Sequence, residues 1–329
     1  MKINFGFVAM SLALEDASPS KSTTLKVLEK LDKPVLESKL TKITRENLTN
    51  TLRVLRHANA HQIKFYRFTS KLVPFATHSV VDDWDYIKSC EEEFSKVGAF
   101  IKDNLIRTGA HPDHFTVLNS PKAEVVESAV KDLEYHDKIF AAMGLDNRVK
   151  LVLHVGGKYG SKGNSLARFK DNFRQLPENI KQRIIIENDD KIFNIADTLA
   201  LCRDLKIPMV LDFHHHRCND GGFLLKDYLP KIIETWPSGL KPKMHISSAK
   251  NEKQFRSHAA DIGWEDFLWV AEELKDCDSD IDLMVEAKNK DQAVLNLAEK
   301  IRRDGRWKLQ GDGTVIMGSG LNYSLIKSY

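Results

Sequence analysis

The stretch Ile207-Pro-Met-Val-Leu-Asp-Phe-His-His-His-Arg217 joins a short apolar run to an acid and three consecutive histidines. A continuous apolar run bounded by polar residues is typical of a strand inside a parallel sheet. The run stops at Asp212, and His214, His215 and His216 follow within four residues. Since Asp and His are ordinary ligands of zinc and manganese, the stretch predicts a metal site at the mouth of such a sheet. The alternative interpretation of this stretch, taken alone, is a solvated loop that contains histidines.

The same strand-then-helix pattern recurs along the chain and predicts a single (β/α)8 TIM barrel of the α/β class. Apolar runs predict strands at residues 3–8, 63–68, 106–111, 149–154, 183–187, 207–212, 242–246 and 281–286. Helical periodicity follows at residues 41–60, 82–105, 123–143, 165–176, 192–205, 224–235, 264–274 and 291–303. We expect the barrel to span residues 1–303, with 15–40 as a long loop or short helices and 304–329 as a Gly-rich tail of unclear structure.

Most of the predicted strands end in a residue that can bind a metal: His111, His154, Glu187, Asp212, His245 and Glu286. In a (β/α)8 barrel these ends meet at one face and carry the catalytic groups. An ionisable side chain on a buried strand is costly unless it is paired or ligated. The set therefore predicts a mixed histidine and carboxylate site for more than one ion. Taken singly, each histidine has the alternative of a hydrogen-bonded core residue, and each acid that of a cap or an ion-pair partner. The pattern does not decide on His258, which lies in a loop.

Composition sets broad limits on the class of protein. The 329 residues are 42% hydrophobic and 29% charged with a net charge of +3, which is ordinary for a soluble globular protein, so any basic groove must be local. Four widely spaced cysteines predict reduced thiols and a cytoplasmic protein. Residues 1–18 have the alternative of a short signal peptide, but residues 3–8 also supply the first strand that the barrel requires. No apolar run is long enough to span a bilayer.

Two loops and one short segment predict contacts with a polyanion. Residues 156–163 are rich in glycine and include Lys158 and Tyr159, so backbone amides and a cation could approach phosphate. We expect further cations on the same face: Lys250, Lys253, Arg256, Lys288 and Lys290. The alternative for all these charged residues is an ordinary solvated surface. His114 and Phe115 follow His111 closely, and planar groups beside a metal site suit stacking on a base. Phe115 has the alternative of a core residue.

Several motifs together resemble those of the UV damage endonucleases. They are His154-Val-Gly-Gly-Lys-Tyr-Gly, Ile186-Glu-Asn-Asp-Asp, Leu211-Asp-Phe-His-His-His, Leu283-Met-Val-Glu-Ala-Lys, Arg67-Phe-Thr-Ser, Pro74-Phe-Ala-Thr-His78, His111-Pro and Leu118-Asn-Ser-Pro121. The similarity runs from about residue 1 to residue 300. It implies a fold like that of the barrel-type abasic-site endonucleases and a cluster of two or three divalent metals, taken as Mn2+ with Zn2+ or Mg2+ as alternatives.

Carried over by position, the resemblance implies a set of metal ligands: His111, His154, Glu187, Asp212, His215, His245, His258 and Glu286. It selects the middle histidine of three and leaves His78, His214 and His216 without a role. It also implies that Glu187, Glu286 and Lys243 are catalytic, with Lys243 either carboxylated or an ordinary lysine.

The resemblance also bears on contacts with DNA. His114 and Phe115 stand where relatives have Gln-Tyr to probe the damaged bases, and Phe7 stands where they often have Tyr. Both changes keep planar groups but lose hydrogen-bonding atoms, which bears on lesion preference rather than on cleavage. Lys158, Tyr159 and Arg217 complete the residues that we expect to contact DNA.

The favoured hypothesis is a metal-dependent repair endonuclease that nicks the backbone 5′ to ultraviolet photoproducts, in some members also at abasic sites, and leaves a 3′-OH. We expect a cytoplasmic monomer that associates with the nucleoid when bound to its partner, damaged double-stranded DNA, and no membrane contact. The alternative is a metal-dependent sugar isomerase or epimerase on the same barrel, since a fold alone does not fix a function. A non-catalytic binding module would not require carboxylates on so many strand ends.

Overall fold

Eight parallel strands close into a barrel in the computed structural model, which describes residues 1–318. The strands are β1 (Lys2–Val8), β2 (Phe65–Phe68), β3 (Arg107–Ala110), β4 (Lys150–His154), β5 (Ile184–Glu187), β6 (Met209–Asp212), β7 (Lys243–Ile246) and β8 (Ile281–Val285). Each pairs in parallel with the next, and β1 pairs with both β8 and β2, which closes the ring. The prediction of a (β/α)8 barrel is confirmed, with a strand at each predicted place.

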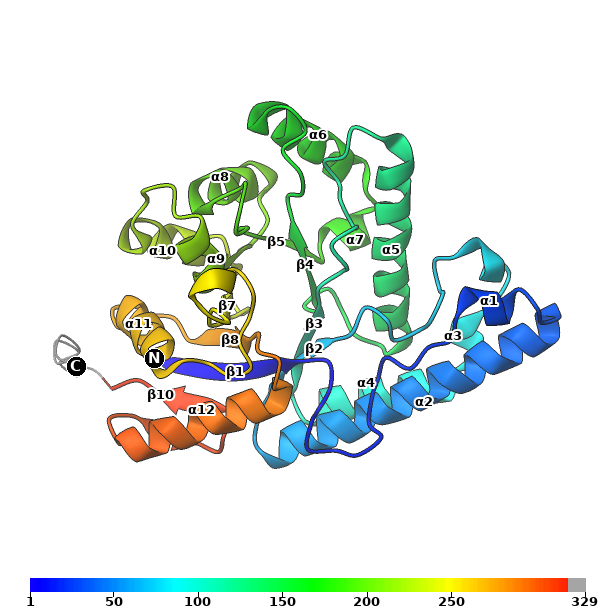
Figure 1. Ribbon diagram of the computed structural model, residues 1–329, viewed down its shortest axis with the longest axis horizontal. Helices are drawn as coiled ribbons and strands as arrows, with labels where there is room; N and C mark the ends of the chain where they lie inside the picture. Colours follow the sequence, from blue (N-terminus) through cyan, green and yellow to red (C-terminus); the bar gives the residue numbers. More distant parts are fainter. Residues whose placement is uncertain (319–329) are drawn as a thin grey trace.

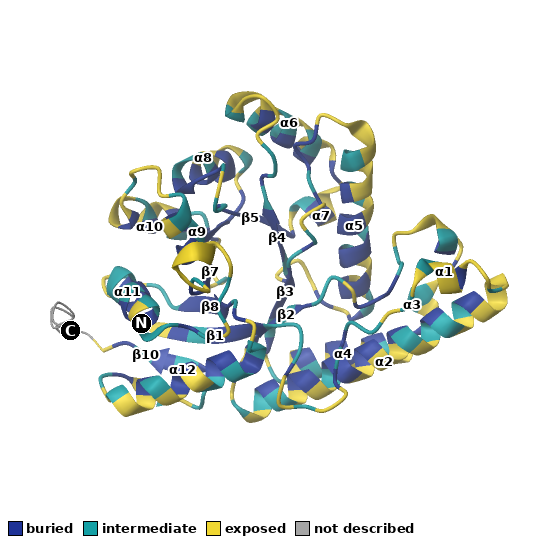
Figure 2. Ribbon diagram, in the orientation of Figure 1, coloured by how far each residue is buried: buried dark blue, intermediate teal, exposed yellow. Residues whose placement is uncertain are grey.

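Helices surround the strands and cover their outer faces (Figure 1). They are α1 (Leu25–Leu28), α2 (Lys33–Ala60), α3 (Tyr86–Ser89), α4 (Glu91–Asp103), α5 (Ala123–Ala142), α6 (Lys162–Gln175), α7 (Glu178–Lys181), α8 (Ile195–Leu205), α9 (Phe213–Cys218), α10 (Leu225–Ile233), α11 (Trp264–Leu274) and α12 (Lys290–Asp304). Their inner faces and the strands are buried, while their outer faces are exposed (Figure 2). Among the described residues, none of these helices combines the length and the apolar character that crossing a membrane requires.

The barrel has an apolar layer outside the strands and a mixed layer inside them. Alternate residues of a strand point to opposite faces, so each strand contributes to both layers. Inside, Val152, Ile185 and Val210 pack together on Trp236. The remaining inward positions are largely charged or small, and Lys243 is among them. From β7 round to β3 the interior therefore mixes polar side chains with the Phe65 ring, which lies 5.5 Å from the Arg107 guanidinium and 5.6 Å from Lys243 Nζ.

Two helical segments differ from the prediction. The helix expected at residues 41–60 begins earlier, at Lys33, with Pro34 in its first turn, where proline's fixed φ is favourable. The helix expected at 82–105 is divided into α3 and α4, because Cys90 leaves the helical region with a φ of −128°. The interruption lets α4 turn along α2 rather than continue the direction of α3 (Figure 1).

A C-terminal hairpin lies beside the first strand. Strands β9 (Lys308–Gln310) and β10 (Thr314–Ile316) pair with each other, and β10 runs antiparallel to the first residues of β1. Asp312 in the turn forms ion pairs with His61 and Arg302. A Cβ at Gly313 would lie 2.3 Å from the backbone oxygen of Gln62, so this close approach needs glycine. The predicted tail thus contains a hairpin, and residues 319–329 lie outside the described part.

Candidate metal centre

The C-terminal ends of the strands bring four histidines around one carboxylate, that of Glu187 at the end of β5. Its Oε2 lies 3.1 Å from His111 Nε2 and 3.6 Å from His154 Nε2. Its Oε1 lies 2.8 Å from His245 Nδ1 and 3.4 Å from His215 Nδ1. Because Glu187 is buried, these imidazoles are its main surroundings. Strand-end residues far apart in the sequence therefore meet at one point.

Two more carboxylates extend the cluster toward β6 and β8. Glu286 Oε1 lies 3.1 Å from His245 Nδ1, while Asp212 Oδ2 lies 3.8 Å from His215 Nδ1 and 3.9 Å from His245 Nδ1. Three groups have ligand atoms within 4.8 Å of one another, and they share Glu187 and Asp212: His111–His154–Glu187, Glu187–Asp212–His215 and Asp212–His245–Glu286. The cluster is thus continuous across the barrel mouth.

His258 lies at the edge of this cluster. Its Nδ1 is 3.9 Å from Glu286 Oε2, and it belongs to none of the three groups. It sits on the returning side of the β7–α11 loop, where a bridge between Ala249 and His258 fixes the loop. The loop therefore brings a histidine to the centre although no strand ends there.

The carboxylates of Glu187 and Glu286 are ionised. Burial works to raise the pKa of Glu187, but the surrounding imidazoles, His245 first, hold that pKa well below its usual value. Burial acts in the same way on Glu286, and Arg67, whose guanidinium donates to Glu286 Oε1, lowers the pKa of Glu286. Both acids therefore offer negatively charged oxygens at neutral pH.

Asp212 tests whether the cluster fits a bound cation. One of its oxygens accepts a hydrogen bond from the backbone N–H of His215 at 2.7 Å, but its Oδ2 accepts none. Burial raises the pKa of Asp212 well above its usual value. A buried acceptor left without a partner costs about 1–3 kcal/mol. A divalent cation among these imidazoles would satisfy that oxygen, so the residues present fit a metal.

The carboxylates around His215 also favour a positive charge at this position. Burial lowers its pKa, but Asp212 and Glu187 outweigh burial and raise that pKa to about 11. Asn188 holds the surrounding backbone, since its side chain exchanges hydrogen bonds with the backbone of Asp212 and its carbonyl lies 3.0 Å from His215 Nδ1. The imidazole is therefore held in a fixed orientation next to two carboxylates.

The short helix α9 explains why only the middle histidine reaches the centre. Successive residues of a helix point in directions about 100° apart. His214 packs on Phe255, with its Nε2 3.8 Å from Cys218 Sγ, and His216 is buried elsewhere. Only His215 lies among the acids, which is the choice that the resemblance implied.

Lys243 is a buried lysine below the cluster. It is 2% exposed, and its Nζ has no hydrogen-bond partner among the described residues. Burial, then Arg67 and Arg107, lowers the pKa of Lys243 to about 7. Burial therefore favours the uncharged form of this amine.

Comparisons with known proteins agree with this geometry. The family model described as UV-endonuclease UvdE matches residues 3–311. The chain belongs to this family. The UV DNA damage endonuclease of Bacillus pumilus (strain SAFR-032) is 42% identical over 96% of this chain and 99% of its own, and that of Bacillus velezensis (strain DSM 23117 / BGSC 10A6 / LMG 26770 / FZB42) is 44% identical over 92% and 94%.

A solved structure of the family has the same fold. The crystal structure of SacUVDE superposes with a TM-score of 0.83 and 30% identity, covering 92% of this chain and 99% of the other. Membership of the UvdE family makes the protein an endonuclease. The isomerase alternative is therefore set aside.

The planar pair predicted to contact DNA stands at the rim of the centre. His114 and Phe115 follow β3, and Phe115 is 51% exposed, so it is not a core residue. Their rings lie 5.9 Å apart in an edge-on arrangement. Thr116 anchors the segment by donating a hydrogen bond to Asp132 of α5 at 2.6 Å. The two rings are thus presented to solvent from a fixed support.

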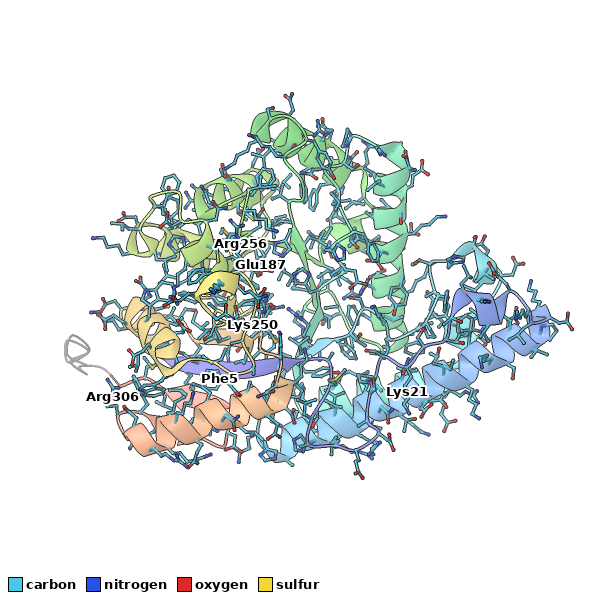
Figure 3. The ribbon with its side chains drawn as sticks, in the orientation of Figure 1. Phe5, Lys21, Glu187, Lys250, Arg256 and Arg306 are labelled. Carbon is cyan, nitrogen blue, oxygen red and sulfur yellow. The ribbon has the colours of Figure 1, made fainter. Side chains whose placement is uncertain are left out.

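The two predicted basic loops expose their lysines to solvent. Lys158 and Tyr159 are exposed on the β4–α6 loop, and the Arg168 guanidinium lies 5.7 Å from the Tyr159 ring. Lys250 and Arg256, labelled in Figure 3, belong to the β7–α11 loop, whose His258 lies 3.9 Å from Glu286, and Arg256 forms an ion pair with Asp190. This loop therefore carries cations beside the metal cluster.

Two predicted DNA contacts do not have the expected surroundings. Phe7 is completely buried and packs edge-on against Tyr66, because its position on β1 points to the helices rather than into the barrel. The prediction that Phe7 contacts DNA is not supported by the structure. Arg217 pairs with Asp266 and lies between the rings of Phe255 and Trp269, so much of its hydrogen-bonding capacity is used internally.

The strand-end pattern missed two residues that shape the site. Arg67 lies on β2 and pairs with Glu286, and Asn188 connects the ends of β5 and β6. Both appear in motifs that resemble the family, but neither is a usual metal ligand. A cation two residues after Phe65 on a buried strand was the available signal for Arg67.

Proposed function

We propose that the protein is a metal-dependent DNA repair endonuclease that nicks the backbone 5′ to ultraviolet photoproducts and leaves a 3′-OH. The observation that carries this proposal is the convergence of strand-end acids and imidazoles on Glu187, in a chain whose relatives are named UV DNA damage endonucleases. Abasic sites are a second proposed substrate. A cytoplasmic, monomeric enzyme that acts on damaged double-stranded DNA stays a prediction.

The cluster would hold two or three divalent cations. We assign the eight predicted ligands to them, with Glu187 and Asp212 shared between neighbouring ions because each belongs to two of the three groups. Imidazole ligands suit manganese or zinc better than Mg2+, which prefers oxygen, and we propose Mn2+. When bound, the ions would lower the pKa of water and offset the negative charge that develops on the phosphate.

The protein's own groups set the charge and shape around the scissile phosphate. Arg67 keeps Glu286 ionised, so that carboxylate is available without a proton to lose. Lys243 has an amine of lowered pKa, and an uncharged amine is the form that reacts with carbon dioxide. We therefore propose that Lys243 is carboxylated, which would convert a costly buried cation into a further oxygen ligand.

The rim residues would hold damaged DNA against this centre. His114 and Phe115 are placed to stack on bases displaced from a distorted duplex. Lys158 and the cations of the β7–α11 loop would contact backbone phosphates. Damaged duplex costs less to bend than intact duplex, which would contribute selectivity.

The test is nicking of ultraviolet-irradiated and untreated plasmid with Mn2+ and with chelator. We expect nicking of the irradiated plasmid only, and only with the metal. The variant Glu187→Gln should lose at least about 100-fold in nicking rate, since it removes a charge that four imidazoles and the metals share, and should still bind irradiated DNA in a gel-shift assay. Equal nicking of both plasmids, or full activity in the variant, would contradict the proposal.

A further inference from the structure

A cavity of about 690 Å³ lies at the mouth of the barrel opposite the metal centre. The C-terminal hairpin creates it: residues Lys2 to Asn4 of β1 pair with β10, and β2 reaches β1 only from Gly6 onward. The hairpin thus occupies the place beside β1 where the wall of the barrel would otherwise close. Its residues Gln310 and Thr314 line the cavity.

Cations dominate the lining of this cavity: Lys2, Lys64, Lys102, Arg107, Arg148 and Lys241. The acids there are fewer, namely Asp146, Asp280 and Asp282. Arg148 pairs with Asp146, and Arg107 pairs with Asp282. Since these pairs use two of the three acids, the cavity keeps an excess of positive charge.

Three of the lysines have no ionic partner in the part of the chain that the structure describes. The ammonium groups of Lys2, Lys102 and Lys241 form neither a salt bridge nor a hydrogen bond with residues 1–318, and all three side chains are exposed at the rim. Asp280 accepts a hydrogen bond from the backbone N–H of Lys2, not from its side chain. These lysines are therefore available to an external anion.

Arg107 supplies a fixed donor at the base of the cavity. Its Nη1 donates to the carbonyl of Lys241 at 2.7 Å and to Asp282 at 2.6 Å, while its Nη2 is buried without a partner among the described residues. Its guanidinium lies 5.5 Å from the Phe65 ring and 5.4 Å from the Trp236 ring, which hold it in place. Arg107 therefore contributes a fixed positive charge at the base of the cavity.

We propose that this cavity binds a small phosphorylated anion. The ammonium groups of Lys2, Lys102 and Lys241 would bind the phosphate oxygens at the rim, and the fixed charge of Arg107 would attract the anion from the base. The volume lies in the range of small-molecule sites, about 300–1,000 Å³, so it has room for a nucleotide as well as for pyrophosphate. The site is separate from the metal centre and does not depend on the proposed nicking activity.

The test is calorimetric titration of the full-length, metal-loaded protein with pyrophosphate, ATP and adenosine. We expect both phosphorylated compounds to bind and adenosine to give no heat. Tighter binding of ATP than of pyrophosphate would assign a nucleotide, and equal binding would assign the phosphate group alone. Trp236 fluorescence should change on binding, and this change should be lost in Trp236→Phe.

Lysine variants separate this cavity from phosphate binding at the metal centre. Lys2→Ala, Lys102→Ala and Lys241→Ala should each weaken anion binding about twofold to fivefold, as for partly exposed charges, and the triple variant should weaken it at least about tenfold. Lys226→Ala, on the outer surface of α10, is the matched control and should bind as the wild type does.

Three results would overturn the proposal. The first is no heat with either anion at millimolar concentration, and the second is equal affinity in the triple variant and the wild type. The third is a loss of affinity for damaged DNA in the triple variant, which would make these lysines DNA contacts. Plasmid nicking by the triple variant should be unchanged, so failure here is distinguishable from failure of the proposed nuclease function.

Discussion

Phe115 is an exposed aromatic residue four positions after His111 of the candidate metal centre, and its exposure makes it a clean test of DNA contact. Phe115→Ala should weaken binding to irradiated DNA by about 1–3 kcal/mol, the contribution of one stacked base. Fluorescence anisotropy with irradiated and untreated duplexes measures this. Phe115→Tyr keeps the ring and should retain affinity, and the thermal stability of both variants should match the wild type. Unchanged affinity in Phe115→Ala would contradict the stacking role.

Lys243 gives a pH dependence whose sign follows from its lowered pKa. The unfolded chain binds the lysine proton up to its ordinary pKa of about 10.4, whereas the folded protein releases it near 7. Burial of Lys243 therefore destabilises the protein fully below pH 7, and this effect is relieved as the pH rises toward 10.

The variant Lys243→Met should consequently stabilise the metal-free protein at pH 6.5 and much less at pH 9.5. Urea unfolding in carbonate-free buffer at the two pH values measures the difference. Lys226→Met, at an exposed position of α10, is the control. An equal gain in the free energy of unfolding at pH 6.5 and at pH 9.5 would contradict the lowered pKa of Lys243.

At the scale of single residues, the sequence predicted the acids and imidazoles of the candidate site better than the residues that hold them in place. Strand-end ligands could be found because a charged residue interrupts an apolar run. Arg67 could not be found in that way, since it lies within β2 and acts by pairing with Glu286. Phe7 was misplaced because an aromatic residue on a strand fits either face, and alternation from Gly6 directs it outward.

Among the elements, the β7–α11 loop (residues 247–263) makes the most direct prediction about DNA. Lys250 and Lys253 are exposed in the same loop as His258, a proposed metal ligand, and form no ion pair within the described residues. Replacing both with alanine should reduce the salt dependence of DNA binding, by about 0.9 in the slope of log K against log salt for each phosphate that the loop no longer neutralises. Anisotropy at several salt concentrations measures the slope.

The control for the loop variant is Lys30→Ala, in an exposed lysine of the α1–α2 connection. It should leave the slope unchanged. An identical slope in the loop variant and the wild type would remove the loop from the DNA-binding surface. Nicking of saturated DNA should stay near the wild-type rate, because neither lysine touches the carboxylates.

The regular elements were predictable, and the irregular ones were not. Strands and long helices have strong periodic signals, whereas the division at Cys90 depends on local contacts of one residue. The β9–β10 hairpin was missed because its strands are short, and its position depends on Asp312 meeting His61 and Arg302 from distant parts of the chain. The periodicity within a short segment carries no information about contacts with residues far away in the sequence.

For the whole molecule, the acidic cluster links metal binding to stability. Asp212 has an oxygen without a partner among the described residues, and its pKa is raised, so the metal-free barrel contains an unfavourable centre. Mn2+ should raise the melting temperature, with a stabilisation of about 2.7 kcal/mol at a metal concentration 100 times the Kd. Differential scanning fluorimetry with Mn2+ and with chelator measures the shift.

His154→Ala and Lys226→Ala separate specific from general effects of the ion. The first removes a ligand and should reduce the shift, while the second should leave it unchanged. An equal shift in His154→Ala would place the stabilising ion elsewhere. Since the proposed ligands come from most of the strands, loss of the metal should destabilise the C-terminal ends of the strands together.

The pairing of β10 with β1 brings the start of the chain and residue 317 together, since Met317 N–H donates to the carbonyl of Met1 at 3.0 Å. A short linker could join these two points, and a new start could be opened in an exposed loop such as residues 237–239. Such a circular permutant should keep the order of strands around the barrel. The permutant would also place the hairpin within the chain, where it offers an attachment point for probes beside the cavity that Gln310 and Thr314 line.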